Sequence, residues 1–386
     1  MGYIIIMKKR HLFVAIFFLI IFFYCSSVSV YGAENVSEIS EQINFSQIDT
    51  IVKEMNGNSF SFRELVTLLM KGDIVLAIKS IGNGMIQSLF QEVSGNRKLM
   101  IQVISIVIFS AVFTNLSSAF ASHTVGETGF FVTYLILITI LSTAYGISFQ
   151  LTKEVIENLL DFMKVFLIAF CMSVTTASGV SSSTGLYAVL MLAITSVNYL
   201  ILTILLPLAN FYFILQIVDR LGEEQHFSKL SILIKKVIEW SLRILFSAIT
   251  GVQVLQSLLL PAIDSVKSSV IKKGVTLIPG AGQAMATVFN TMLGAGVIVK
   301  NSIGIAGFLC IILMIGIPII KLVVVSVGYE WLVAIMQPVA DKRMLGCIQG
   351  VSQGISLLLK MIWVVSALFL LSLVIAIATT NMKYMT

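Results

Sequence analysis

Long runs of apolar residues, separated by short polar stretches, dominate this chain. Five of these runs are about twenty residues long and almost free of charge, which is the length of an α-helix that crosses the hydrocarbon core of a bilayer. The pattern predicts an all-α, polytopic membrane protein with about six to eight membrane helices, some of them broken at proline or lying in the interface. The five runs are Ile101–Ala121, Gly129–Phe149, Leu186–Leu206, Ile303–Val327 and Trp363–Thr380.

Two other apolar stretches leave the number of crossings open. Val165–Ala177 is short and follows Gln150–Lys164, which we interpret as a polar connection. Leu186–Val218 is too long for one ordinary span and contains Pro207, so it fits either a kinked helix or a pair of half-helices.

Residues 1–32 have the layout of a secretory signal peptide. Three basic residues at positions 8–10 precede the apolar stretch Leu12–Cys25, and small residues follow in Ser26–Gly32. We expect cleavage before Ala33, with an uncleaved anchor helix as the alternative.

Residues 33–98 differ from the rest, because their apolar positions are spaced rather than continuous. Ser61 and Glu64 fit a capping box at a helix start, and Leu65, Leu68 and Leu69 would then share one face. We expect a small helical module, and after a signal peptide it would be extracytoplasmic.

The membrane part divides into three segments. Residues 99–218 hold the N-terminal membrane helices, and residues 251–386 form a C-terminal membrane region. Between them, residues 219–250 place Lys229, Lys236 and Arg243 on one side of an amphipathic helix. This pattern is typical of a helix in the membrane interface, and the basic residues favour the cytoplasmic side.

Proline occurs only in the C-terminal half. It removes one helical N–H group and frees a carbonyl, which hydrocarbon cannot hydrate, so each proline is a candidate helix break. Such breaks suit the core of an assembly or of a pathway. The five positions are Pro207, Pro261, Pro279, Pro318 and Pro338.

A few charges lie inside or beside apolar sequence. Lys321 and Glu330 predict either a polar passage between helices or a lysine that snorkels or pairs with a carboxylate. Asp264, Lys272 and Lys273 lie around a predicted helical hairpin, which either docks a partner or is an ordinary interfacial loop.

Glycines recur every fourth residue at Gly346, Gly350 and Gly354, so they share one helix face and let another backbone approach closely. This candidate packing seam joins helices either within one chain or between subunits.

Composition excludes several classes of function. The chain is 58% hydrophobic and 11% charged, with a net charge of +6, and it has no basic run interleaved with aromatics that would indicate nucleic-acid binding. No phosphate-binding loop, zinc-protease motif or serine-nucleophile motif occurs, and the four cysteines are scattered. We therefore expect no enzyme activity, no cofactor and no metal site.

Four short motifs in the C-terminal half carry a family resemblance. Together they are similar to the stage III sporulation protein AE family, and the resemblance is strongest over residues 251–380. The motifs are Leu259-Leu260-Pro261-Ala262-Ile263-Asp264, Leu277-Ile278-Pro279-Gly280-Ala281-Gly282, Lys300-Asn301-Ser302-Ile303-Gly304 and Met336-Gln337-Pro338-Val339-Ala340-Asp341.

The resemblance implies a multi-pass protein in the mother-cell membrane around the forespore, within a channel-like or secretion-like complex needed for forespore development. It implies other stage III A proteins as partners, including a separate ATPase and ring-forming subunits, and a forespore protein across the intermembrane space. A stand-alone secondary transporter for a small solute is the alternative.

Overall fold

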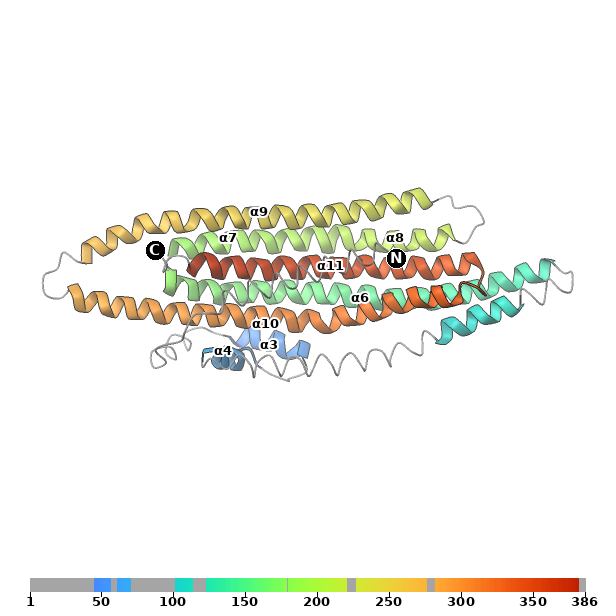
Figure 1. Cartoon of the computed structure of the whole chain (residues 1–386), viewed down its shortest axis with the longest axis horizontal. Coiled ribbons are helices and arrows are strands. Elements are labelled where there is room, and N and C mark those ends of the chain that lie inside the picture. The colour runs from blue at the N-terminus through green and yellow to red at the C-terminus, as the bar shows by residue number, and fades with distance from the viewer. Residues whose placement is uncertain are drawn as a thin grey trace.

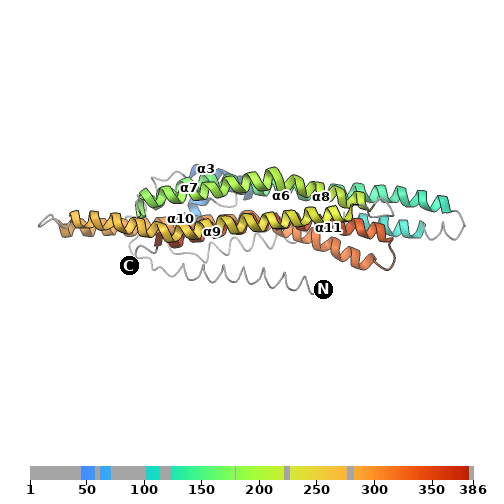
Figure 2. The same ribbon diagram turned by 90° about the horizontal axis from the view of Figure 1, so that it is seen from above.

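The computed structural model describes residues 45–56, 61–70, 101–113, 123–178, 180–220, 227–275 and 282–381. The regular elements among these residues are all helices, and most of them lie side by side along one axis (Figures 1 and 2). They are α3 (Ser46–Asn56), α4 (Phe62–Met70), a helix over Ile101–Phe113, α6 (His123–Ser178), α7 (Val180–Val197), the π-helix η1 (Asn198–Leu205), α8 (Leu206–Asp219), α9 (Ser228–Val275), α10 (Gly282–Met336) and α11 (Lys342–Asn381).

Five helical segments in the described part of the chain are long and apolar enough to cross a membrane, and Ile101–Phe113 is a shorter apolar helix. This confirms the predicted fold class, an all-α polytopic membrane protein. The five segments are Thr128–Thr175, Ser183–Asp219, Ser228–Leu259, Gly296–Met336 and Lys342–Thr379.

Helix α11 is the centre of the bundle. It packs against α6, α7, α8, α9 and α10, and Figure 1 shows it between α7–α8 on one side and α6 and α10 on the other. Its inward residues are almost fully buried, including Ile355, Leu358 and Met361. The candidate site therefore has to be sought around α11.

Helix α6 corrects the prediction of a polar connection over Gln150–Lys164. The helix runs through this stretch and continues to Ser178. The charges support the helix, because Lys153 pairs with Glu157 and Asp161 pairs with Lys164 at helical spacing. The apolar residues of the same stretch, such as Leu159, are buried on the other face.

Proline breaks the helices less than predicted. Leu186–Val218 forms one continuous run in which η1 precedes Pro207, and the Leu206 N–H donates to the carbonyl of Ile201, five residues back. A π-helical turn absorbs the irregularity without ending the helix.

Pro261 and Pro318 also lie within helices, since α9 and α10 continue through these positions. Pro338 is the exception, because it lies in the turn over residues 337–340 that joins α10 to α11. The Pro279 prediction falls outside the described residues.

The described residues of the predicted interfacial segment, 219–250, belong to the end of α8 and the first half of α9, and their position in the membrane interface stays a prediction. Helix α9 then packs lengthwise on α7, α8 and α11 (Figure 1), because one face carries buried residues such as Ile234, Ile238 and Leu242.

Helices α3 and α4 lie against the bundle. The Ser61 hydroxyl accepts a hydrogen bond from the Glu64 N–H at 3.4 Å, which bears out the N-terminal cap predicted for α4. The buried face of α4 contacts α10, α3 contacts α6, and the Phe62 ring lies 6.2 Å from the Phe166 ring of α6. The signal peptide falls outside the described residues.

Candidate functional site: a polar seam along α9

Polar side chains on α9 are hydrogen-bonded to α8 and α11 at four successive levels of the bundle. This is unusual in a chain of such apolar composition, because polar groups at membrane depth are expensive and usually functional. We call this set the polar seam. Its members are Gln216, Ser231, Lys235, Glu239, Gln253, Gln353, Lys360 and Ser372.

An ion pair lies near the middle of the seam. The Lys360 ammonium of α11 donates to the Glu239 carboxylate of α9 at 2.6 Å, and both side chains are only about a quarter to a third exposed, at 30% and 25%. Lys360 is eighteen positions from the start of α11, which has 40 residues. The pair therefore joins the two helices just before the uncharged runs that begin at residue 244 of α9 and residue 361 of α11.

The next contacts centre on Gln353, about two helical turns before Lys360 in α11. The Gln353 side-chain oxygen accepts a hydrogen bond from the Tyr212 hydroxyl at 3.1 Å and a long one from the Lys235 ammonium at 3.5 Å. Further along, the Gln216 amide of α8 donates to the Ser231 hydroxyl at 3.0 Å. Helices α8, α9 and α11 therefore meet through polar groups at this end of the bundle.

At the other end of the seam, the Gln253 amide donates to the Ser372 hydroxyl at 2.6 Å, and both side chains are buried. Residues 244–263 of α9 and 361–381 of α11 contain no charged residue. Gln253 and Ser372 lie at the middle of these two runs, each of which has the length of one membrane span.

Lys321 of α10, a charge predicted to lie inside the membrane, is level with the ion pair. Mutual hydrogen bonds join Ser326 of α10 to Ser352 of α11, and these two helices run in opposite directions (Figure 1). Lys321 is five residues before Ser326, so it is at the height of about residue 357 of α11. Along the bundle axis this height is within one helical turn of Lys360.

A groove of about 430 Å³ surrounds Lys321. Helix α6 lines it with Glu154, Asn158 and Asp161, and α10 contributes Pro318 beside Lys321. The two predicted interpretations of Lys321, a polar passage between helices and a lysine that snorkels or pairs with a carboxylate, both stay predictions. Glu330, the other predicted charge of α10, is exposed.

The glycine seam faces the interior of the same chain. A methyl group on Gly350 would lie 3.1 Å from the Gln216 side chain of α8, and one on Gly354 would lie 3.0 Å from the Tyr145 ring of α6. A methyl group on Gly346 would likewise lie 3.1 Å from Arg220. The missing side chains therefore let α11 approach α6 and α8 closely.

The structure does not describe the side chains of three predicted partner-facing charges, Asp264, Lys272 and Lys273.

The sequence analysis missed two central residues of the polar seam, Glu239 and Lys360. A signal for Lys360 was present, because it is the one charged residue between Arg343 and Lys383. An isolated charge in a long apolar run indicates a functional position.

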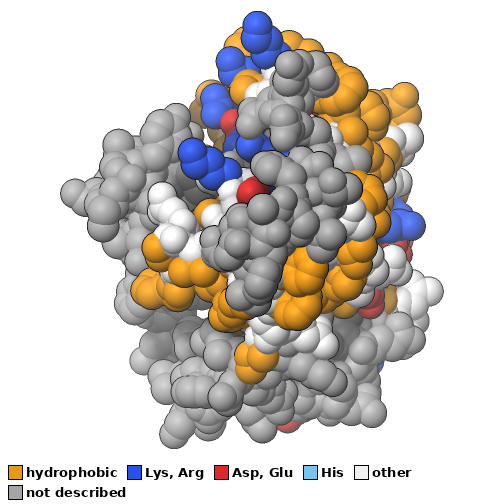
Figure 3. Space-filling model, turned by 90° about the vertical axis from the view of Figure 1, so that its right-hand side faces the viewer, with side chains coloured by type: hydrophobic (Ala, Val, Ile, Leu, Met, Phe, Trp, Pro, Cys, Tyr) orange, Lys and Arg blue, Asp and Glu red, His pale blue; other side chains and the backbone are white. Residues whose placement is uncertain are grey.

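The surface around the seam is largely apolar. Viewed from the end where α8 and α10 finish, Lys and Arg side chains gather at the edge that α9 occupies, and apolar side chains cover much of the other described surface (Figure 3). The first turns of α9 supply exposed Lys229 and Lys236. In the described residues no group of three His, Cys, Asp or Glu side chains could hold a metal ion.

Comparison with known proteins gives one family. The family model described as stage III sporulation protein AE matches residues 60–380. The stage III sporulation protein AE of Bacillus subtilis (strain 168) is 24% identical over 307 residues, which cover 77% of this chain and 75% of the relative. No solved structure matches this chain.

Proposed function

This chain belongs to the stage III sporulation protein AE family, and from that membership we propose that it is a non-enzymatic, multi-pass membrane component of a channel-like or secretion-like complex. The complex would link the mother cell to the forespore and would be required for forespore development. The membership itself rests on a match over residues 60–380 and on the Bacillus subtilis relative.

The polar seam is the observation that carries this proposal. The seam holds an ion pair, three glutamines and two serines between its helices, and polar or ionisable groups at membrane depth are expensive and usually mark functional positions. A polar interface between membrane helices can exchange its hydrogen bonds with water or with a passing polar group. Such an interface suits a membrane component of a conducting or secreting assembly.

The length of the helices supports a role in an assembly. The candidate spans contain 32 to 48 residues, whereas a helix tilted by about 40° crosses a hydrocarbon core of about 30 Å with only about 26 residues. Part of the bundle therefore extends beyond the hydrocarbon. Exposed apolar side chains, such as Phe211 of α8 and Trp331 and Ile335 of α10, offer contact area to other proteins.

Partners and location follow from the family as part of the same proposal. We expect other stage III A sporulation proteins, including a separate ATPase and ring-forming subunits, and a forespore protein across the intermembrane space. The chain would lie in the mother-cell membrane around the forespore, with its N-terminal module outside the cytoplasm.

The test is made in a spore-forming host whose own copy is replaced by variants. Glu239→Gln combined with Lys360→Met should abolish or strongly reduce spore formation while the protein still accumulates and still co-purifies with the stage III A proteins. Lys236→Met, on the exposed side of α9, is the matched control and should sporulate normally.

Two results would contradict the proposal. One is normal forespore development without this chain. The other is transport of a small solute by the purified chain alone in liposomes, which is the behaviour of a stand-alone transporter.

A further inference from the structure

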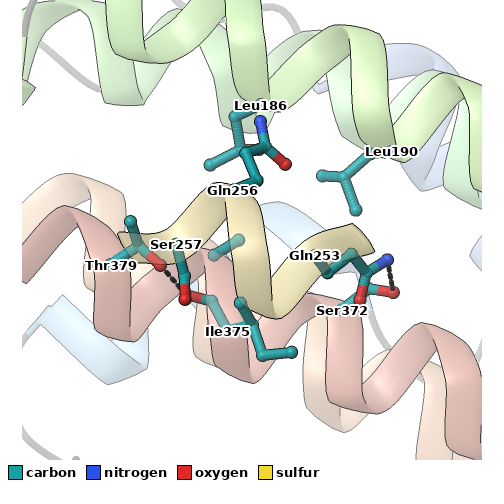
Figure 4. A pocket seen from close by; sticks show the side chains of 9 residues that line it. Leu186, Leu190, Gln253, Gln256, Ser257, Ser372, Ile375 and Thr379 are labelled. Atoms are coloured by element: carbon teal, nitrogen blue, oxygen red, sulfur yellow. Dashed lines mark hydrogen bonds between the residues drawn. The ribbon is translucent and has the colours of Figure 1, made fainter. Parts of the chain in front are cut away.

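A small cavity lies between α7, α9 and α11, next to the Gln253–Ser372 contact (Figure 4). Its volume is about 20 Å³, and a cavity of roughly 10–15 Å³ on this measure already holds one water molecule. Helix α7 gives it an apolar wall, and α9 and α11 add amide and hydroxyl groups beside the apolar Ile375 and Ala376. The lining includes Leu186 and Leu190, Gln253 and Ser257, and Ser372 and Thr379.

The hydroxyl groups around this cavity have no hydrogen left to donate into it. Ser257, Ser372 and Thr379 each donate to a carbonyl three or four residues earlier in their own helix, at 2.7 Å in every case. A hydroxyl group has one hydrogen and two lone pairs. These three oxygens can therefore only accept further hydrogen bonds.

Gln253 adds a fourth acceptor, and this one is unsatisfied. Its side chain is 3% exposed, and its amide nitrogen already donates to Ser372. No described residue donates a hydrogen bond to its side-chain oxygen, which is fully buried. A buried acceptor without a donor loses the hydrogen bond that water gives it in the unfolded chain, so it destabilises the folded state.

We propose that this cavity binds one water molecule, which donates one hydrogen bond to the Gln253 side-chain oxygen and the other to a hydroxyl oxygen of α9 or α11. The volume fits one water, and a water supplies the two donors that these lining groups lack. The α9–α11 contact is thereby hydrated in the middle of two uncharged runs, at the depth where lipid supplies no donor.

A monovalent cation is the competing occupant, because it too is attracted by convergent oxygens. None of the residues that line the cavity carries a negative charge. An uncompensated charge among apolar helices is costly. A neutral donor satisfies the same oxygens without that cost.

Infrared spectroscopy of the full chain in lipid nanodiscs tests the hydration site. In D₂O the wild-type protein should show an O–D stretching component that shifts when the oxygen is replaced by ¹⁸O. Gln253→Met removes the unsatisfied oxygen at similar volume and should lose that component. Gln349→Met removes an exposed glutamine of α11 and should keep it.

Thermal unfolding in sodium chloride and in choline chloride separates the two occupants. A sodium-dependent rise in Tm that Gln253→Met abolishes would overturn the water assignment in favour of a cation. Absence of any ¹⁸O-sensitive component in the folded wild-type protein would also overturn it. If Gln253→Met does not fold, Ser257→Val, which fills the cavity, should lose the same component.

Discussion

Glu239 and Lys360 form an ion pair between α9 and α11 although they are 121 positions apart in the chain. The carboxylate and ammonium are 2.6 Å apart, and both side chains are mostly buried between the helices. Long-range pairs of this kind fix the position of α9, whose own apolar contacts are less extensive than those of α11.

Removal of one partner should destabilise the bundle. Lys360→Met leaves the Glu239 carboxylate without its donor, and we expect a loss of about 1.5–3 kcal/mol, the range for a hydrogen bond to a charged group. Thermal unfolding in detergent measures the change. Lys236→Met removes a lysine that is exposed on α9 and should leave Tm almost unchanged.

The reversed pair distinguishes an electrostatic contact from simple packing. Glu239→Lys combined with Lys360→Glu restores opposite charges, so this double variant should recover a substantial part of the stability that Lys360→Met loses. A double variant as unstable as one with two like charges would contradict the ion pair as the source of stability.

Substitution of Gly354 by alanine, which adds only a methyl group, should destabilise the protein. The added carbon would lie 3.0 Å from the Tyr145 ring, which is stacked on Phe213 with ring centroids 3.7 Å apart. The Tyr145 hydroxyl is also bonded to the Ala209 carbonyl at 3.0 Å, so the ring cannot easily move. We expect Gly354→Ala to cost about 1–3 kcal/mol of unfolding free energy.

Gly251→Ala is the matched control for that substitution. Position 251 is exposed on α9, and nothing lies within 4 Å of a methyl group there. Alanine should stabilise the helix by about 0.5–1 kcal/mol relative to glycine. Equal effects of the two substitutions on Tm would show that helix propensity alone determines the change in stability, and that the contact to Tyr145 contributes nothing.

The apolar runs predicted the fold class because a hydrocarbon solvent imposes a length and a composition on each span. They also placed Gly346, Gly350 and Gly354 on one face, since that spacing depends only on helix geometry. The ends of the helices were harder to predict. In α6, the charges of Gln150–Lys164 suggested a connection, but they lie on one exposed face of a continuous helix.

The partners in the polar seam could not be predicted from the sequence. Gln253 and Ser372 are 119 positions apart, and no local pattern reveals which helix faces which. Pro318 misled the prediction for a different reason: one proline removes a single hydrogen bond, and neighbouring helices hold α10 together across it. Tertiary packing therefore determines both which helices face each other and whether a helix continues through proline.

The paired serines of α10 and α11 should contribute measurably to stability. The Ser352 hydroxyl donates to the Ser326 carbonyl at 2.9 Å, and the Ser326 hydroxyl donates to the Ser352 carbonyl at 3.3 Å. Both side chains are buried. Ser352→Ala should cost about 0.6–2 kcal/mol, as hydrogen bonds between membrane helices do.

A double-mutant cycle with Ser326→Ala checks this pair. The two substitutions should be less than additive, because either one removes the contact between the two hydroxyl oxygens, which are 3.4 Å apart. Ser105→Ala is the control, since the Ser105 hydroxyl bonds only to its own helix and its position is exposed. Full additivity of the two serine substitutions would exclude a coupled contact between α10 and α11.

Phe62 should hold the N-terminal helices against the bundle. Its side chain is fully buried, between the Phe45 ring at 5.5 Å and the Phe166 ring at 6.2 Å. Large-to-small substitution of a buried phenylalanine costs about 3–5 kcal/mol. Because α4 has only nine residues and α3 only eleven, a loss of that size should release both helices from α6 and α10 while the bundle stays folded.

Hydrogen exchange with mass spectrometry resolves this local release. In Phe62→Ala, peptides from residues 45–70 should exchange faster, while peptides from α11 should keep their protection, because α11 makes its contacts elsewhere. Arg63→Ala truncates the neighbouring exposed side chain and should leave both regions unchanged. Faster exchange throughout α6 and α10 as well would mean that α3 and α4 are integral to the bundle, whereas unchanged exchange in residues 45–70 would show that Phe62 is not their anchor.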